Sequence, residues 1–346
     1  SVIANAWYES GTPTLEELPL IGRAARTLDG GVKVLGGQPA PIYPGDWFWT
    51  ASRALNYEPG EAQPITEFPF FTFLYGDLHA HMIAMPLSML ALGWAIGVAL
   101  SAGRRGAGEQ GSREDPADNR QLTTDNWQPT TANWPLTLLV GALAIGVLRP
   151  TNTWDWPTYL LLGGLALAYT VLQTDGLNLR GLGKAALLAV GLFGLSALLF
   201  LPYTANYGAA YSSVSLWPGS YTRAWNYLIV HGLFLFFVVT HLTREARAWT
   251  ATWTEEGKRR WEPLGRVVVA ALLLFVVLTA ALLVRGYAVA PIALPLLVVA
   301  GLLALRPGLE TGRRVVLALM SAALGLTLLV EIIVLDGDVG RMNTVF

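Results

Sequence analysis

Side chains able to do chemistry gather in the stretch EFPFFTFLYGDLHAHMIAMP, where Asp77, His79 and His81 occupy alternate positions. All three would point to one side of an extended segment, whereas only Asp77 and His81 would share a face of a helix. A carboxylate with imidazoles can hold a divalent metal ion, and it can also move a proton to or from a hydroxyl group. We therefore take the three as candidate catalytic residues, and Asp77 with His79 as a candidate metal site. In the alternative interpretation, Asp77 caps the first membrane helix and the histidines lie among lipid headgroups.

A second polar group stands in RPTNTWDWPTY, residues 149–159, where Arg149, Asn152 and Asp155 lie close to two tryptophans. The prolines predict a tight turn between two helices. Because the planar guanidinium of Arg149 matches the oxygens of a phosphate group, we take these three residues as candidates for substrate binding. Alternatively, Arg149 pairs with Asp155 and the tryptophans anchor the helices at the membrane interface.

Three further residues are candidates for substrate binding because of where they stand in apolar sequence. His231 lies within the apolar run WNYLIVHGLFLFF, and an ionisable group inside a membrane helix usually faces protein or water. Glu331 stands near the end of the last apolar stretch, and Arg341 follows it. The alternatives are an interhelical hydrogen bond for His231 and snorkelling to the interface for Arg341.

The chain around these polar groups is mostly apolar, since 53% of the 346 residues are hydrophobic and 14% are charged. Such a chain is typical of a polytopic integral membrane protein, here of the cell membrane. The net charge of −1 gives no basic excess, so nucleic acid is excluded as a partner. The absence of cysteine excludes disulfides and thiolate chemistry. Because the chain begins at Ser1 without a leader, we expect a fragment of a longer protein.

The elements that must position the polar groups are membrane helices, each requiring about 20 apolar residues. The sequence predicts an all-α polytopic membrane protein with about eight transmembrane helices, in a bundle over 82–346. The expected spans are 82–102, 135–149, 157–173, 184–202, 225–243, 266–284, 288–305 and 314–335. Residues 1–81 form a first loop in which TLEELPLIGRAARTL predicts an amphipathic helix, lying against a membrane or against a domain surface. Residues 103–133 are a polar linker.

Charge in the loops predicts the orientation of the helices. One side would hold Arg104, Arg105, Arg113, Arg120, Arg180, Lys184, Arg244, Arg247, Lys258, Arg259, Arg260, Arg266, Arg306, Arg313 and Arg314. The short loops of the other side would hold Arg149, Arg223, Arg285 and Arg341. Basic residues favour the cytoplasmic side, so residues 1–81 and all the polar groups above are expected on the non-cytoplasmic side, and the linker in the cytoplasm.

Five strings of the chain, in order, carry a resemblance to a known family: FWTASR, ITEFPFFTFLYGDLHAHMIAMP, RPTNTWDWPTY, HGLFLFF and DGDVGRMNTVF. Together they resemble the uncharacterised polytopic "YYY" membrane-protein family, a domain of unknown function grouped with the GT-C superfamily of membrane glycosyltransferases. The likeness covers residues 47–346, although the tyrosine triplet that names the family is not in this chain.

The resemblance implies a GT-C-like helical bundle with a large external first loop. It also implies transfer of a sugar from a polyprenyl-phosphate donor, with an acidic Asp-x-Asp-like motif in an external loop near the membrane. Asp77-Leu78-His79 stands where such a motif is expected, with histidine in place of the second acid. This departure leaves open whether a divalent metal is the cofactor and which residue is the base.

The primary hypothesis is therefore glycosyl transfer from a lipid-phosphate-linked sugar at the non-cytoplasmic face, in contact with the lipid bilayer. Asp77 would be general base or metal ligand, and Arg149 or Arg341 would neutralise the departing phosphate. One alternative is a non-catalytic subunit of a larger membrane complex, bound to partner subunits. Another is a transporter using His231 and Glu331, but the polar residues gather on one side instead of at the midplane.

Overall fold

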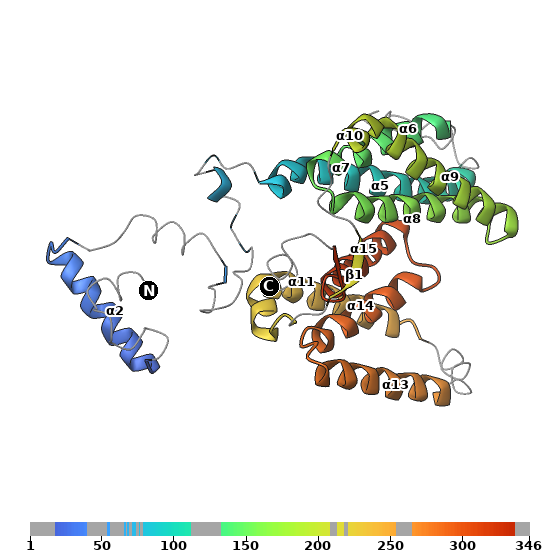
Figure 1. Ribbon diagram of the computed structural model, residues 1–346. Helices are drawn as coiled ribbons and strands as arrows, with labels where there is room; N and C mark the ends of the chain where they lie inside the picture. Colours follow the sequence, from blue (N-terminus) through green and yellow to red (C-terminus); the bar gives the residue numbers. More distant parts are fainter. Residues whose placement is uncertain are drawn as a thin grey trace, which may run out of the picture. The chain divides into compact units, whose positions relative to one another are not determined.

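The computed structural model describes residues 18–39, 54–55, 66, 68, 71–73, 76, 79–111, 133–207, 213–217, 221–253 and 265–335. The chain forms two compact units, Ser1–Asp77 and Leu78–Phe346. In the described part of the first unit the principal element is the helix α2 (Leu20–Leu35). The second unit holds the long apolar helices (Figure 1).

Apolar helices occupy the stretches in which spans are expected. They are α5 (Ala80–Gly111), α6 (Trp134–Gly146), α8 (Asp155–Asp175), α9 (Leu179–Leu199), α11 (Ala224–Thr250), α13 (Gly265–Val284), α14 (Ala290–Leu305) and α15 (Thr311–Leu329). Within the described residues, five stretches are long and apolar enough to cross a membrane: Ala80–Ala102, Trp134–Thr151, Leu179–Leu199, Ala224–Thr250 and Thr311–Leu329. Val269–Val284 and Ala290–Leu305 are shorter apolar helices. The predicted class, an all-α polytopic membrane protein, is confirmed.

Short elements complete the turns between these helices. The helices α7 (Leu148–Thr151) and α10 (Leu201–Asn206) follow α6 and α9. The last long helix ends at Leu329, earlier than the expected span, and Ile333–Leu335 forms strand β2. It pairs antiparallel with β1 (Val214–Leu216). The β-branched residues of EIIVL favour this strand because they pack well on a pleated surface.

The first helix group, α5 to α10, packs around the indole of Trp94 on α5. The Trp94 Nε1 donates a hydrogen bond of 3.1 Å to the carbonyl oxygen of Thr137 on α6. A Cβ atom at Gly141 or at Gly163 would overlap the indole ring, so only glycine lets α6 and α8 come this close to Trp94. The buried Thr170 hydroxyl on α8 donates to the carbonyl oxygen of Val98 on α5 at 2.8 Å.

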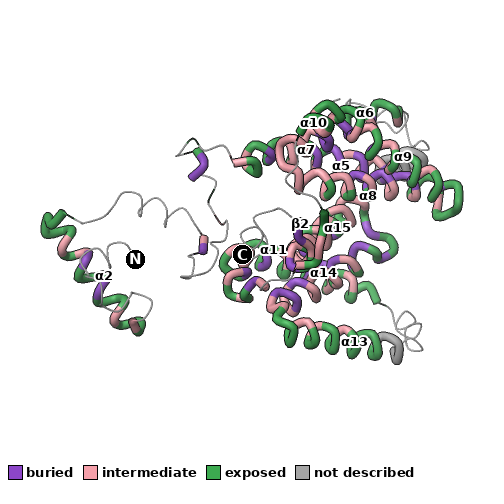
Figure 2. The backbone as a smooth tube through the Cα atoms, viewed as in Figure 1, coloured by how far each residue is buried: buried purple, intermediate pink, exposed green. Residues whose placement is uncertain are grey.

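The second helix group comprises α11, α13, α14 and α15. Its core forms where α14 and α15 meet α11, with Leu242, Ala300, Leu303 and Leu317 buried together. In contrast, the described side chains of α13 are exposed along most of the helix (Figure 2). A helix that is apolar all round and exposed suits a lipid environment, in which apolar side chains need no protein cover.

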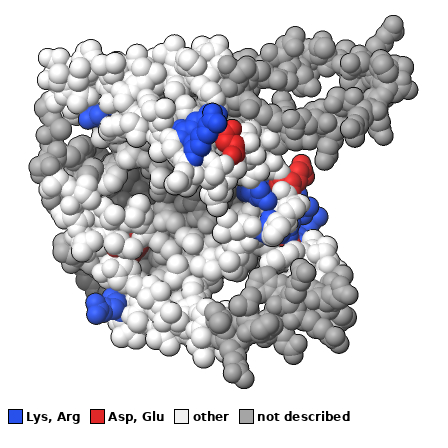
Figure 3. Space-filling view, turned by 90° about the vertical axis from the view of Figure 1, so that its right-hand side faces the viewer, with Lys and Arg blue, Asp and Glu red and all other residues white. Residues whose placement is uncertain are grey.

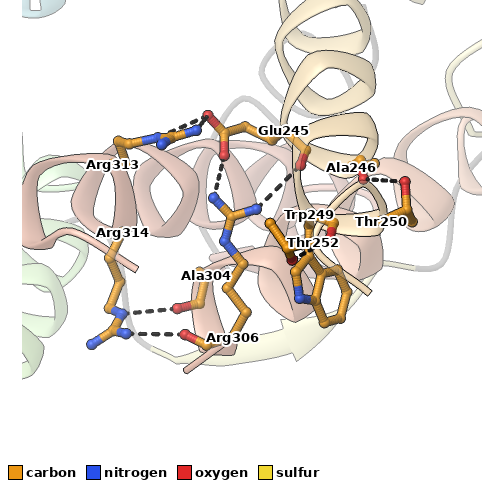
Figure 4. A network of polar contacts seen from close by, with 9 residues as sticks. All are labelled: Glu245, Ala246, Trp249, Thr250, Thr252, Ala304, Arg306, Arg313 and Arg314. Carbon is orange, nitrogen blue, oxygen red and sulfur yellow. Dashed lines mark hydrogen bonds and ion pairs between the residues drawn. The ribbon is translucent and has the colours of Figure 1, made fainter. Parts of the chain in front are cut away.

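An ion-pair triad, in which Glu245 and Arg306 are buried and Arg313 is exposed, joins three helices of the second group (Figure 4). Arg306 donates to a carboxylate oxygen of Glu245 at 2.5 Å and to the Glu245 carbonyl oxygen at 3.1 Å. Arg313 donates to the other carboxylate oxygen at 2.6 Å and 3.0 Å. Two of the loop arginines used to predict the orientation of the helices, Arg306 and Arg313, thus form ion pairs within the protein.

The two helix groups meet through α15. Val315 packs against the core of the first group, and α15 packs against α5. Arg314 Nη1 lies 3.5 Å from the Tyr169 hydroxyl on α8, while its other nitrogens donate to the carbonyl oxygens of Ala304 and Arg306. The beginning of α15 therefore lies beside the latter part of α8.

On the face drawn in Figure 3, charged side chains of the described residues gather in a few small groups within an uncharged surface.

Candidate functional site

The two histidines stand at the start of α5. The amides of Met82 and Ile83 donate to the His79 carbonyl oxygen at 3.0 and 3.2 Å, so His79 directly precedes the helix and His81 lies in its first turn. Their rings lie 5.4 Å apart between centroids. Gly76, at φ +63°, adopts a left-handed conformation that suits glycine just before this segment.

Asp155 is bound to α5 at the end where that helix begins. Ser88 on α5 donates a hydrogen bond of 2.9 Å from its hydroxyl to the Asp155 carboxylate, which opens α8. Tyr159 stands one turn further along α8 and packs against the core of the first helix group. His81 and Ser88 are seven residues apart, which places them on one face of α5 and about 10 Å apart along its axis.

Arg149 lies over an aromatic ring and makes no ion pair with Asp155. Its guanidinium carbon stands 4.6 Å from the centre of the Trp156 ring, a cation–π geometry. Trp156 Nε1 is buried and has no hydrogen-bond partner among the described residues. Asn152 follows the last residue of α7 as its C-cap, and its carbonyl oxygen accepts from the Asp155 amide at 3.0 Å. We call Ser88, Arg149, Asp155, Trp156 and Tyr159 the Asp155 cluster.

Glu331 lies in a second group of polar residues. Its side chain is 3% exposed, and its two carboxylate oxygens accept from the amide of Thr222 at 3.1 and 3.3 Å. Burial raises the pKa of the Glu331 carboxyl above its ordinary value of 4.5, while hydrogen bonds from Thr222 act in the opposite direction. This carboxyl is therefore more easily protonated than one in water.

His231 belongs to the same region as Glu331 through Tyr227. The Tyr227 hydroxyl lies 3.0 Å from the Thr327 hydroxyl on α15, and its ring lies 4.7 Å from the imidazole of His231. In the loop before α14, the ring of Tyr287 stacks on Tyr221 at 3.7 Å. A hydrogen bond with Tyr221, with burial, raises the pKa of Tyr287 to about 12. We call Thr222, Tyr227, Tyr287, Thr327 and Glu331 the Glu331 cluster.

Both clusters lie at the same ends of the helices. The Asp155 cluster stands where α5 and α8 begin, and the Glu331 cluster stands where α11 begins and α15 ends. The opposite ends of α8 and α15 are marked by the contact between Tyr169 and Arg314. Helix direction thus gathers polar residues from the distant segments 79–88, 149–159, 221–231 and 327–331 at one end.

Several residues of the clusters were not predicted from the sequence: Ser88, Tyr159, Thr222, Tyr287 and Thr327. For Ser88 the sequence does offer an indication, because Ser88 follows His81 by two helical turns on the same face of the helix. For Thr222 the sequence offers no such indication, because no local pattern links it to Glu331, 109 residues further along the chain.

The predicted metal pair is only partly covered by the structure. Asp77 and Arg341 lie outside the described residues. Among the residues that are described, no group of three or more histidine, aspartate or glutamate side chains is placed to hold a metal ion. His79 and His81 supply two imidazoles, so Asp77 and its neighbours would have to complete such a site.

Comparison with known proteins identifies the chain at the level of a family. No curated protein and no solved structure matches it. The model of one family, described as "Uncharacterized membrane protein (DUF2298)", matches residues 5–346. Because this match covers almost the whole chain, the protein belongs to that family of uncharacterised membrane proteins.

Proposed function

We propose that the protein is a membrane glycosyltransferase that moves a sugar from a polyprenyl-phosphate donor to an acceptor hydroxyl. The observation that carries the proposal is the hydrogen bond from Ser88 to Asp155. It joins the helix that follows GDLHAH to the segment that carries Arg149, so that two polar motifs far apart in the sequence share one end of the bundle. A donor with both a phosphate and a sugar needs such neighbouring cationic and acid–base groups.

In the proposed reaction, the acceptor oxygen attacks the anomeric carbon of the sugar. The bond between that carbon and the phosphate oxygen breaks, and the phosphate leaves with the electron pair. Asp77 takes the acceptor proton, and His79 and His81, at the start of α5, position the metal or the phosphate. Arg149 or Arg341 balances the growing negative charge on the phosphate.

A divalent ion, if one is used, would be held by Asp77 and His79 and would draw negative charge from the phosphate oxygens. Asn152 and Asp155 would orient the sugar hydroxyls. We assign His231 and Glu331 to the acceptor, because the Glu331 cluster stands at the same ends of the helices as the Asp155 cluster. The site and residues 1–81 would face the non-cytoplasmic side of the cell membrane.

The test uses the full chain in proteoliposomes that contain a polyprenyl-phosphate-linked hexose, with release of free polyprenyl phosphate as the readout. Asp77→Asn should lower the rate by a factor on the order of 10² to 10⁴, since a general base contributes about that much. Asp155→Asn should weaken donor binding. The matched control is Asp175→Asn at the opposite end of α8, where the exposed Asp175 pairs with Lys184.

Two outcomes would overturn the proposal. One is release at the wild-type rate by Asp77→Asn. The other is a wild-type protein that turns over no polyprenyl-phosphate sugar and retains none when purified.

A further inference from the structure

The helix α2 exposes its apolar side and covers part of its polar side, the reverse of a helix in a water-soluble domain. One stripe along α2 holds aliphatic residues at intervals of seven, four and three residues. These are Ile21, Leu28, Val32 and Leu35, whose side chains are 84%, 70%, 67% and 90% exposed. Arg26 and Gly30, away from this stripe, are buried.

Charges on α2 are confined to the side away from the stripe. The helix itself holds three basic residues, Arg23, Arg26 and Lys33, and one acid, Asp29, which pairs with Lys33 at 2.7 Å. The helix therefore carries a net positive charge beside an uncharged apolar stripe. Helices with this pattern lie in the plane of a bilayer surface, with basic side chains among headgroups and aliphatic side chains in the acyl boundary. Anionic headgroups complement the basic excess.

We propose that α2 is a membrane-surface helix whose stripe lies in the lipid of the bilayer that the apolar helices of this chain cross. Residues 36–79 connect α2 to α5, so the bilayer is always within reach of the helix and binding costs little additional entropy. The proposal goes beyond the proposed sugar transfer and does not depend on it.

The chain has no cysteine, so a cysteine introduced on α2 is the unique labelling site. Leu28→Cys and Val32→Cys place the label on the stripe, and Arg23→Cys and Thr27→Cys are matched controls on exposed positions outside it. Each full-length variant is labelled with a polarity-sensitive fluorophore in vesicles of phosphatidylcholine with a minor fraction of phosphatidylglycerol. Quenching is measured with spin-labelled lipids and with aqueous iodide.

The expected result is strong quenching by spin-labelled lipid at residues 28 and 32, and quenching by iodide at residues 23 and 27. Iodide quenching at all four positions would show that the stripe faces water and would overturn the proposal. Protection of residues 28 and 32 from both quenchers would show a protein cover instead of lipid and would also overturn it.

Discussion

At the scale of single residues, three buried or half-buried carboxylates have different partners and so different properties. Asp155 accepts from a serine hydroxyl, Glu245 is held by two arginines, and Glu331 accepts from a backbone amide. An arginine pair keeps a carboxylate ionised, whereas burial without a nearby cation favours the protonated form. Glu245 is thus a structural anion, whereas Glu331 is suited to gain a proton.

The attachment of the segment before α11, residues 213–217 and 221–223, should depend on pH through Glu331. Because its pKa is raised in the folded protein, its contribution is complete below pH 4.5 and declines as the pH rises through the raised pKa. Hydrogen exchange at the Thr222 amide, corrected for the intrinsic effect of pH, should therefore speed up over that range. Glu331→Gln, neutral at every pH, should remove this dependence.

The matched control for Glu331→Gln is Glu310→Gln. Glu310 is exposed and directly precedes α15, the helix that ends shortly before Glu331. This control should retain the wild-type pH dependence. Identical exchange profiles for wild type and Glu331→Gln would contradict the role given to Glu331.

Removing the charge of Glu245 should destabilise the second helix group. Glu245→Gln would leave Arg306, which is 8% exposed, without its counter-charge, and such a loss costs about 3 to 5 kcal/mol. Thermal unfolding of the detergent-solubilised protein should show a clear fall in the midpoint. Asp175→Asn removes an exposed ion pair and should change it little. Equal midpoints for the two variants would argue against the triad as a stabilising element.

At the scale of elements, glycines determine how closely the first group packs. Gly141→Ala should lower the free energy of unfolding by about 1 to 3 kcal/mol, because the new Cβ overlaps the Trp94 ring. Gly194→Ala on α9 is the matched control, because its Cβ would meet no atom within 4 Å, and alanine favours the helix there. Unfolding by denaturant measures both. A Gly141→Ala protein as stable as Gly194→Ala would show that Trp94 moves aside freely.

Sequence patterns predict the apolar helices well but not the short elements that close them. Hydropathy identifies the stretches that become the long apolar helices, because about 20 consecutive apolar residues are the length that crosses a bilayer as a helix. The sequence does not predict the end of α15 because Ile333–Leu335 is as apolar as a span, and only pairing with β1 makes it a strand. Likewise, the contact of Ser88 with Asp155 depends on how α5 packs against α8, which no local pattern encodes.

At the scale of the whole molecule, alternating helix direction explains why polar residues of distant segments stand at the same end of the helices. We expected the groups around His79, Arg149 and Glu331 on one face of the membrane, and the described residues of these groups stand at one end of the helices. Loop charge and helix count predict a common face of the membrane for these groups. They do not give the division into an Asp155 cluster and a Glu331 cluster, which follows from helix packing.

The sidedness of the protein can be tested with two single-cysteine variants. Asn206→Cys, at the end of α10, and Arg180→Cys, at the start of α9, lie at opposite ends of α9 on exposed positions. On intact cells, an impermeant maleimide should label Asn206→Cys and should reach Arg180→Cys only after permeabilisation. Labelling in the opposite order would place the candidate site in the cytoplasm and would exclude a non-cytoplasmic transfer reaction.

The ion-pair triad also bears on how the protein is made. Glu245 is synthesised 61 residues before Arg306 and 68 residues before Arg313, so α11 reaches the membrane with its acidic side chain still without these partners. Only after α14 and the start of α15 have left the ribosome do both arginines become available. Assembly of the second helix group is therefore a late event in biosynthesis, and a chain truncated before Arg306 would present an unneutralised Glu245 to the quality-control machinery of the membrane.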